Sequence, residues 1–141
     1  METSDLRRRL AETIDAARRT AAERRARAET ASRDYSQFLD TVAVPLFRQV
    51  ANILKASGYS FTVFTPSGSV RLMSDKASED YIELSLDTSA DEPMVMGKSS
   101  RARGRRVVES ERAIAEYSVA NLTEDHVLNY VLKELEPFVE R

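Results

Sequence analysis

The sequence predicts an α+β protein with a long N-terminal, coiled-coil-like helix, a second helix, an antiparallel sheet of four to five strands and a C-terminal helix. Residues 4–44 contain no Gly or Pro and are rich in Ala, Arg and Glu, which all favour helix. Residues 59–96 show the period-two alternation of strands, and residues 123–135 return to helical spacing. A chain of 141 residues suffices for one hydrophobic core with an extension.

The first helix carries its apolar side chains at a seven-residue repeat, which is typical of coiled coils. Arg24 interrupts one of the two heptad positions, and the alanines in the middle make the repeat weak there, because burying a methyl group contributes only about 0.8 kcal/mol. We therefore expect residues 1–44 to be a helical oligomerisation segment and residues 45–141 to form the α+β domain. The predicted seam consists of Leu10, Ile14, Ala17, Ala21, Ala28, Ala31, Tyr35, Phe38 and Val42.

The length of this helix predicts self-association. A helix of about 40 residues extends about 60 Å, whereas the rest of the chain should form a body with a radius of gyration of about 13 Å. In a monomer much of the seam would then be exposed to water. We therefore expect a second copy of the chain to bury the seam, and the protein to be a homodimer. The alternative is a compact monomer, in which the helix bends back at Arg24 or near Tyr35 and packs on its own sheet.

Two shorter helices are expected beside the sheet. Pro45 removes a backbone donor, so it breaks or kinks the first helix and opens a second one over residues 45–57, which Gly58 ends in a left-handed conformation. Thr123 is placed as the N-cap of the last helix, ahead of two acids that favour its first turn. The buried stripes expected are Leu46, Val50, Ile53 and Leu54 for the second helix, and Val127, Leu128, Val131, Leu132 and Leu135 for the last.

Strands are indicated by alternation between these helices. A first hairpin turns at residues 66–68, and a polar connection over residues 75–80 leads to a third strand at residues 81–87. Residues 94–96 fit either an edge strand or ordinary core, and residues 109–120 fit either a final strand or a helix. Tyr59, Phe61 and Val63 share one face of the first strand, and Val70 and Leu72 follow after the turn. In the third strand Ile82, Leu84 and Leu86 alternate with polar residues, so one face is expected to be buried and the other solvated.

Composition argues against most enzyme classes. The chain has no Cys, which removes disulfides, thiolate metal sites and a cysteine nucleophile, and its one His, His126, cannot build a histidine-rich zinc site. No P-loop, dinucleotide fingerprint, nucleophile elbow or zinc-protease motif occurs. We expect a non-enzymatic protein without cofactor or metal. Because no secretory signal or membrane-spanning apolar run is present, we also expect it to be cytoplasmic and to have no membrane partner.

Charge is segregated, although the formal net charge is only −2. Residues 74–92 hold seven acids against one lysine, and their spacing favours a solvent face over a calcium or nuclease site. Residues 98–106 hold five cations and no acid, and are expected to form an exposed, mobile loop. That loop is either a solvated segment or an anion site that binds phosphates without reading bases, since it contains no aromatic residue.

These observations favour an oligomeric interaction or adaptor module whose partners are a second copy of the chain and, as an open alternative, another protein. A second hypothesis is a nucleic-acid-associated protein that uses the basic stretch, with weak and non-specific binding, and a third, left open, is an enzyme whose residues the sequence does not identify. The candidate nucleic-acid-binding residues are Lys98, Arg101, Arg103, Arg105 and Arg106.

Overall fold

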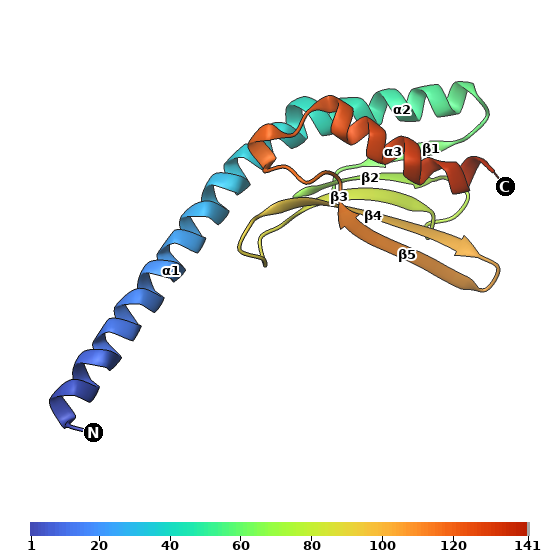
Figure 1. The fold of residues 1–141 in the computed structure, drawn as a ribbon. Helices are drawn as coiled ribbons and strands as arrows, with labels where there is room; N and C mark the ends of the chain where they lie inside the picture. Colours follow the sequence, from blue (N-terminus) through green and yellow to red (C-terminus); the bar gives the residue numbers. More distant parts are fainter. Residues whose placement is uncertain (141) are drawn as a thin grey trace.

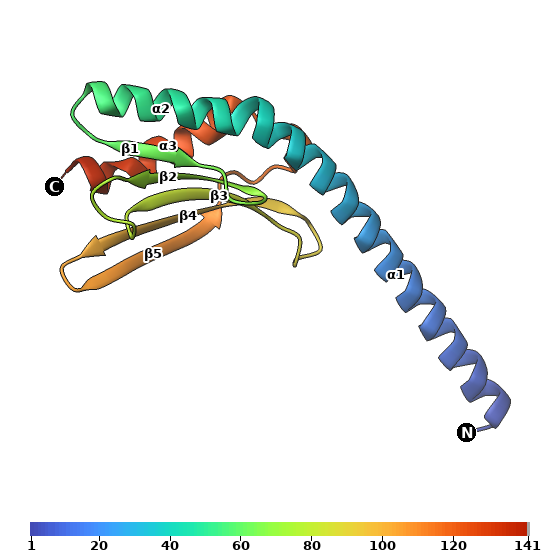
Figure 2. The ribbon, with the colours of Figure 1, turned by 180° about the vertical axis from the view of Figure 1, so that it is seen from behind.

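The computed structural model describes residues 1–140 and has the α+β architecture that the sequence predicts. The helices pack on one face of a five-stranded sheet, and the N-terminal part of α1 projects away from this body (Figures 1 and 2). No helix within residues 1–140 is long and apolar enough to cross a membrane. The elements are α1 (Thr3–Phe38), η1 (Leu39–Ala43), α2 (Val44–Ala56), β1 (Phe61–Phe64), β2 (Ser69–Ser74), β3 (Tyr81–Asp87), β4 (Met94–Arg103), β5 (Arg106–Ala113), η2 (Val119–Asn121) and α3 (Glu124–Val139).

The helical run changes direction before Pro45, and the predicted kink is confirmed (Figure 1). Element η1 is a stretch of π-helix that joins α1 to α2 without an intervening loop. Proline has no N–H to donate and its ring crowds the preceding turn, and a widened turn is a common response to such a defect. The Thr41 hydroxyl donates to the Gln37 carbonyl oxygen at 2.7 Å inside this stretch. Gly58, with φ of 93°, follows α2 in the left-handed conformation that the sequence predicts.

The sheet is a simple meander in which each strand pairs antiparallel with the next, in the order β1-β2-β3-β4-β5. The expected alternation is present, because Val70, Leu72, Ile82 and Leu84 are fully buried beneath the helices. The opposite face carries no helix, as the two ribbon views show (Figures 1 and 2). The sheet therefore presents one packed face and one open face.

The core extends into the C-terminal third of α1. Ala31, Tyr35 and Phe38 are buried together with Phe47 of α2 and Val127 of α3. Tyr35 also donates a hydrogen bond from its hydroxyl to the Gly68 carbonyl oxygen at 2.8 Å, which ties α1 to the β1–β2 turn. This part of α1 is thus covered by its own chain.

Three expectations need correction or completion. The predicted loop over residues 98–106 was wrong, because β4 continues to Arg103 and only Gly104 and Arg105 form the turn to β5. Gly104 has φ of 63°, as the first central position of a type II′ hairpin turn requires. Residues 109–120 are neither wholly strand nor wholly helix, because β5 ends at Ala113 and η2 begins only at Val119. Two members of the expected buried stripes are exposed. Leu132 is exposed because the buried face of α3 instead runs through Val127, Tyr130, Val131, Leu135 and Phe138, and Ile53 because that of α2 runs through Leu46, Phe47 and Ala51.

Candidate functional site

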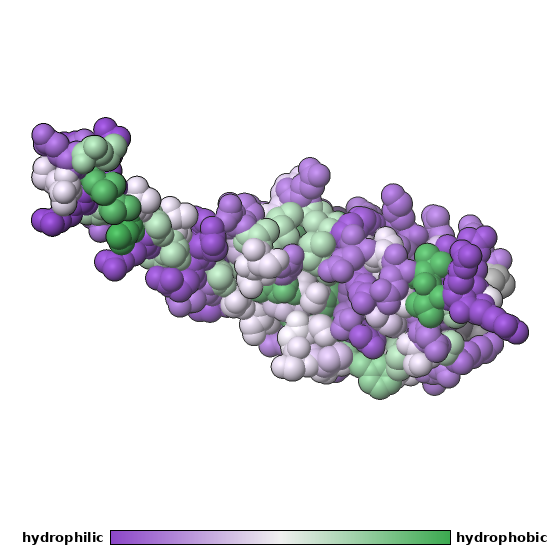
Figure 3. All heavy atoms as spheres, turned by 90° about the horizontal axis from the view of Figure 1, so that it is seen from below, coloured by the Kyte–Doolittle hydropathy of each residue, from purple (hydrophilic) through white to green (hydrophobic). Residues whose placement is uncertain are grey.

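The outer part of α1 exposes apolar side chains at successive turns. Leu6, Leu10 and Ile14 have exposed fractions of 46%, 53% and 47%, which is unusual for large side chains on one helix face. Figure 3, which views the molecule from below, shows hydrophobic atoms near the N-terminal end of the projecting helix. Together with the small residues that continue this face we call these three residues the apolar stripe, formed by Leu6, Leu10, Ile14, Ala17 and Ala21.

The structure divides the predicted seam into two parts. Its C-terminal members pack within the chain, so they are not free to contact a second copy, while its N-terminal members stay accessible. Leu6, which the heptad pattern left out, joins the accessible part because it lies one turn before Leu10. Of the nine predicted positions, Leu10, Ile14 and Ala17 are exposed, Ala21, Ala28 and Val42 are half-buried, and Ala31, Tyr35 and Phe38 are buried.

Two arginines of α1 contact the β3–β4 connection at the point where the helix leaves the body. The Arg24 guanidinium forms an ion pair with the Asp91 carboxylate at 3.1 Å, and Arg27 donates to the Asp91 carbonyl oxygen at 3.2 Å. Both contacts are exposed, so each is worth at most about 1 kcal/mol. Arg24, which interrupts the heptad pattern, thereby links the helix to the β3–β4 connection. In the sequence, the only indication of the contact between Arg24 and Asp91 was that Arg24 interrupts the apolar seam.

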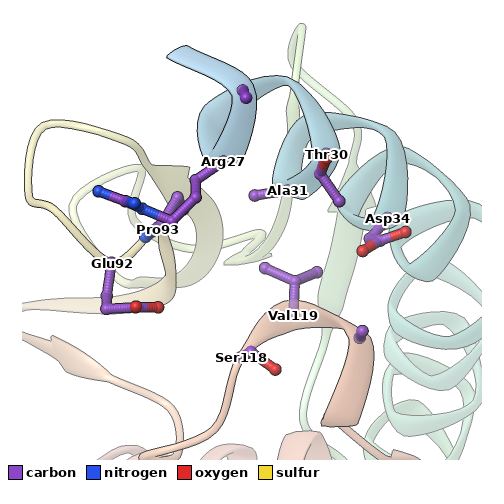
Figure 4. A pocket seen from close by; sticks show the side chains of 10 residues that line it. Arg27, Thr30, Ala31, Asp34, Glu92, Pro93, Ser118 and Val119 are labelled. Carbon is purple, nitrogen blue, oxygen red and sulfur yellow. The ribbon is translucent and has the colours of Figure 1, made fainter. Parts of the chain in front are cut away.

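An open hollow of about 370 Å³ lies at the same junction (Figure 4). Ala31 of α1 and Val119 of η2 face each other across it, and Arg27, Asp34 and Glu92 stand around its rim. This volume is within the range of small-molecule sites, but the apolar floor is small and the hollow is open to solvent. It suits an apolar side chain of a docked segment. Sequence reasoning missed it, because its walls come from three segments far apart in the chain.

The five predicted cations do not form one cluster. Strand alternation places Arg101, Arg103 and Arg106 on the helix side of the β4–β5 hairpin, Arg105 in its turn, and Lys98 on the open face. Within residues 1–140 none of the four arginines forms an ion pair, and Arg103, Arg105 and Arg106 are exposed. The hairpin therefore ends in free positive charge.

Lys98 belongs to a different, internally paired network on the open face. A hydrogen bond with Tyr81 and the nearby Glu109 carboxylate, 3.7 Å from the Lys98 Nζ, raise the pKa of Lys98 above its ordinary value. In the neighbouring strands Arg71 pairs with Glu83 at 3.0 Å and lies over the Tyr81 ring. The charges of this face largely satisfy one another, which leaves little for a ligand.

The remaining polar groups have structural partners. Asp80 is buried and accepts a hydrogen bond from the Ala102 N–H at 2.7 Å, which holds the outer part of β4 to the β2–β3 connection. His126 accepts a hydrogen bond from the Thr123 N–H at 3.0 Å and completes a capping box at the start of α3, and the ring of Tyr117 stacks on it. Across residues 1–140, no three His, Asp or Glu side chains meet as a metal site would require.

Within residues 1–140 the geometry thus offers two candidate surfaces, the apolar stripe and the arginines of the hairpin. The hollow adjoins the first surface at the base of the projecting helix. In comparisons with protein-family models, curated proteins and solved structures, none of the three finds a match to this chain.

Proposed function

We propose that the protein is an interaction module that assembles with a second copy of itself through the apolar stripe. The observation that carries this proposal is the exposure of three large apolar residues on a helix that the rest of the chain does not cover. A helix of about 20 residues without tertiary contacts is marginal in water, because most helical stability in proteins comes from packing of an apolar face. A second copy supplies such packing.

The stripe favours an antiparallel pair. When Ile14 lies opposite Ala17 of the second copy, Leu10 lies opposite Ala21, so each of these layers combines one large and one small side chain, while Leu6 at the edge lies opposite Arg25. The distance between the helix axes then stays even along the contact. A parallel pair would place Ile14 on Ile14 and Ala17 on Ala17, which alternates crowded and empty layers.

The positions of the bodies support the same arrangement. In a parallel pair both bodies would meet at the same end of the helices, so that the two β3–β4 connections, each held to its own α1 through Arg24 and Asp91, would compete for the space there. In an antiparallel pair the bodies lie at opposite ends. The overlap then runs from Thr3 to Ala28, so that the N-terminus of each copy ends near the hollow of the other.

Sedimentation analysis of the full chain tests the assembly. Full burial of Leu or Ile contributes about 1.5–3 kcal/mol, and about half of that is still available at Leu10 and Ile14. Changing both residues to Gln alters four side chains in a dimer. It should therefore remove about 4 kcal/mol of the free energy of association and raise the Kd of the dimer about 1000-fold. The control Glu12→Gln with Arg19→Gln changes the opposite helix face without changing net charge. A wild-type chain that sediments as a monomer at 100 μM, or a control that dissociates equally, contradicts the proposal.

A distance measurement tests the direction of the pair. Because the chain has no Cys, Ser4→Cys provides a single attachment site for a spin label. In the antiparallel register Ser4 lies opposite Arg27 of the second copy, so the two labelled residues are about 35 Å apart along the helix axes. A parallel pair would hold them within about 10 Å of each other. A short distance would refute the antiparallel arrangement while leaving the assembly itself standing.

A further inference from the structure

We propose that the end of the β4–β5 hairpin is a binding site for the phosphate backbone of double-stranded nucleic acid. The site comprises four side chains, which we call the arginine tip: Arg101, Arg103, Arg105 and Arg106. This inference is independent of the assembly through α1, because the two surfaces lie on different elements.

The arrangement of the arginine tip concentrates charge on one face. Arg101 and Arg103 are two residues apart on β4, about 7 Å along the strand, and Arg106 lies directly across from Arg103, about 5 Å away. Like charges placed directly opposite each other destabilise a pair of strands. The two acids of β5, Glu109 and Glu111, lie on the other face beside Lys98 and do not offset this repulsion. An anionic ligand would relieve it.

The hairpin holds these side chains in place and presents them outward. The bond from the Ala102 N–H to the buried Asp80 carboxylate anchors β4 between Arg101 and Arg103, and Gly104 permits the tight turn. The hairpin extends away from the helix layer in both ribbon views (Figures 1 and 2). An extended anion can therefore approach the tip without meeting α3.

The chemistry of the tip favours a duplex over other polyanions. Single strands are bound by aromatic side chains that stack on bases, and strands β4 and β5 contain no aromatic residue. A membrane surface is bound by large apolar or aromatic side chains inserted among the headgroups, whereas Gly104 and Arg105 form the turn here and only two exposed valines, Val107 and Val108, lie beside it. A two-stranded ribbon has the width that the major groove admits, and arginine forks match phosphate oxygens. Without base-reading side chains, the binding carries no sequence preference.

Fluorescence anisotropy with a labelled 20-base-pair DNA tests the site. Four phosphate contacts give a slope of about −3.6 in log affinity against log salt, so affinity should fall about 100-fold between 50 and 200 mM salt. Arg103→Ala with Arg106→Ala should weaken binding at 50 mM salt and reduce the slope by about 1.8. The matched control, Arg48→Ala with Lys133→Ala, removes two exposed cations of the helix layer and should leave both unchanged.

Each other outcome overturns the proposal. Equal losses in the control would mean that overall charge, not the arginine tip, attracts DNA. Equal affinity for a single strand of the same length, or stronger binding to vesicles of phosphatidylserine than to the duplex, would exclude the duplex as the ligand. Repeating the titration with Leu10→Gln and Ile14→Gln separates the two proposals, because a monomer should keep the same salt slope per chain.

Discussion

Gly97 should be among the least replaceable residues of the sheet. It lies on the packed face of β4, directly beneath the ring of Tyr130 on α3. A Cβ atom built at this position would lie 2.1 Å from the Tyr130 ring carbon Cζ, far inside contact distance. The ring cannot simply move away, since the Arg112 guanidinium lies over it, 4.6 Å from its centre, and Arg112 pairs with Glu134 at 3.3 Å.

Gly97→Ala should therefore lower the free energy of unfolding by about 3 kcal/mol, the upper end of the cost of overpacking a core. Urea denaturation followed by circular dichroism measures this as a fall in midpoint of about 1–2 M. In a Tyr130→Leu background, which makes room above the strand, the same substitution should cost much less. A loss below about 0.5 kcal/mol, or an equal loss in both backgrounds, would show that the Tyr130 ring does not confine Gly97.

Two pH-dependent effects follow from named groups. Hydrogen bonds from Ser60 and Thr62 lower the pKa of Asp75, so its contribution to stability is present above the ordinary carboxyl pKa and is lost as the pH falls below it. Asp75→Asn should flatten the acid side of a plot of stability against pH. Burial, with a smaller effect of Glu83, raises the pKa of Tyr35, so the folded state loses stability as the pH rises past about 10, where the unfolded chain ionises. Tyr35→Phe should reduce this alkaline loss, to which Tyr130 also contributes because burial raises its pKa, and at neutral pH should cost about 1 kcal/mol of stability for the hydrogen bond to Gly68.

Local patterns in the sequence were enough for most elements of the body. Ile82 and Leu84 alternate with polar residues, which identifies β3 and the face that it buries. The end of β4 and the start of β5 were mistaken for a loop because they lack this alternation. Arg101, Arg103 and Arg106 occupy the positions of the packed face beyond the end of the core, where burial no longer requires apolar side chains.

The candidate surfaces could be predicted only in part. The heptad pattern marks one continuous face of α1, but it does not indicate where the chain's own sheet begins to cover that face. That point depends on how η1 turns the helix and on where the β3–β4 connection meets Arg24. Both are features of the tertiary structure, which local sequence patterns do not reveal. For the same reason the hollow beside Val119 has no signature in the sequence, because only the tertiary fold brings its lining residues together.

The ion pair between Arg24 and Asp91 should influence assembly although neither residue belongs to the apolar stripe. In the antiparallel register Arg7 of the second copy lies opposite Arg24, so two arginines meet at each end of the overlap. The Asp91 carboxylate, 3.1 Å from Arg24 and largely exposed, is placed to offset this repulsion.

Asp91→Asn should therefore raise the Kd of the dimer several-fold in dilute buffer, since an exposed pair is worth about 0.2–1 kcal/mol and occurs twice. The difference from wild type should shrink at 0.5 M salt, where the screening length is only a few ångströms. Glu79→Gln, which removes an exposed acid remote from α1, is the matched control in the same sedimentation experiment. If both variants dimerise like wild type in dilute buffer, Arg7 does not approach Arg24, and the proposed register of the antiparallel pair is wrong.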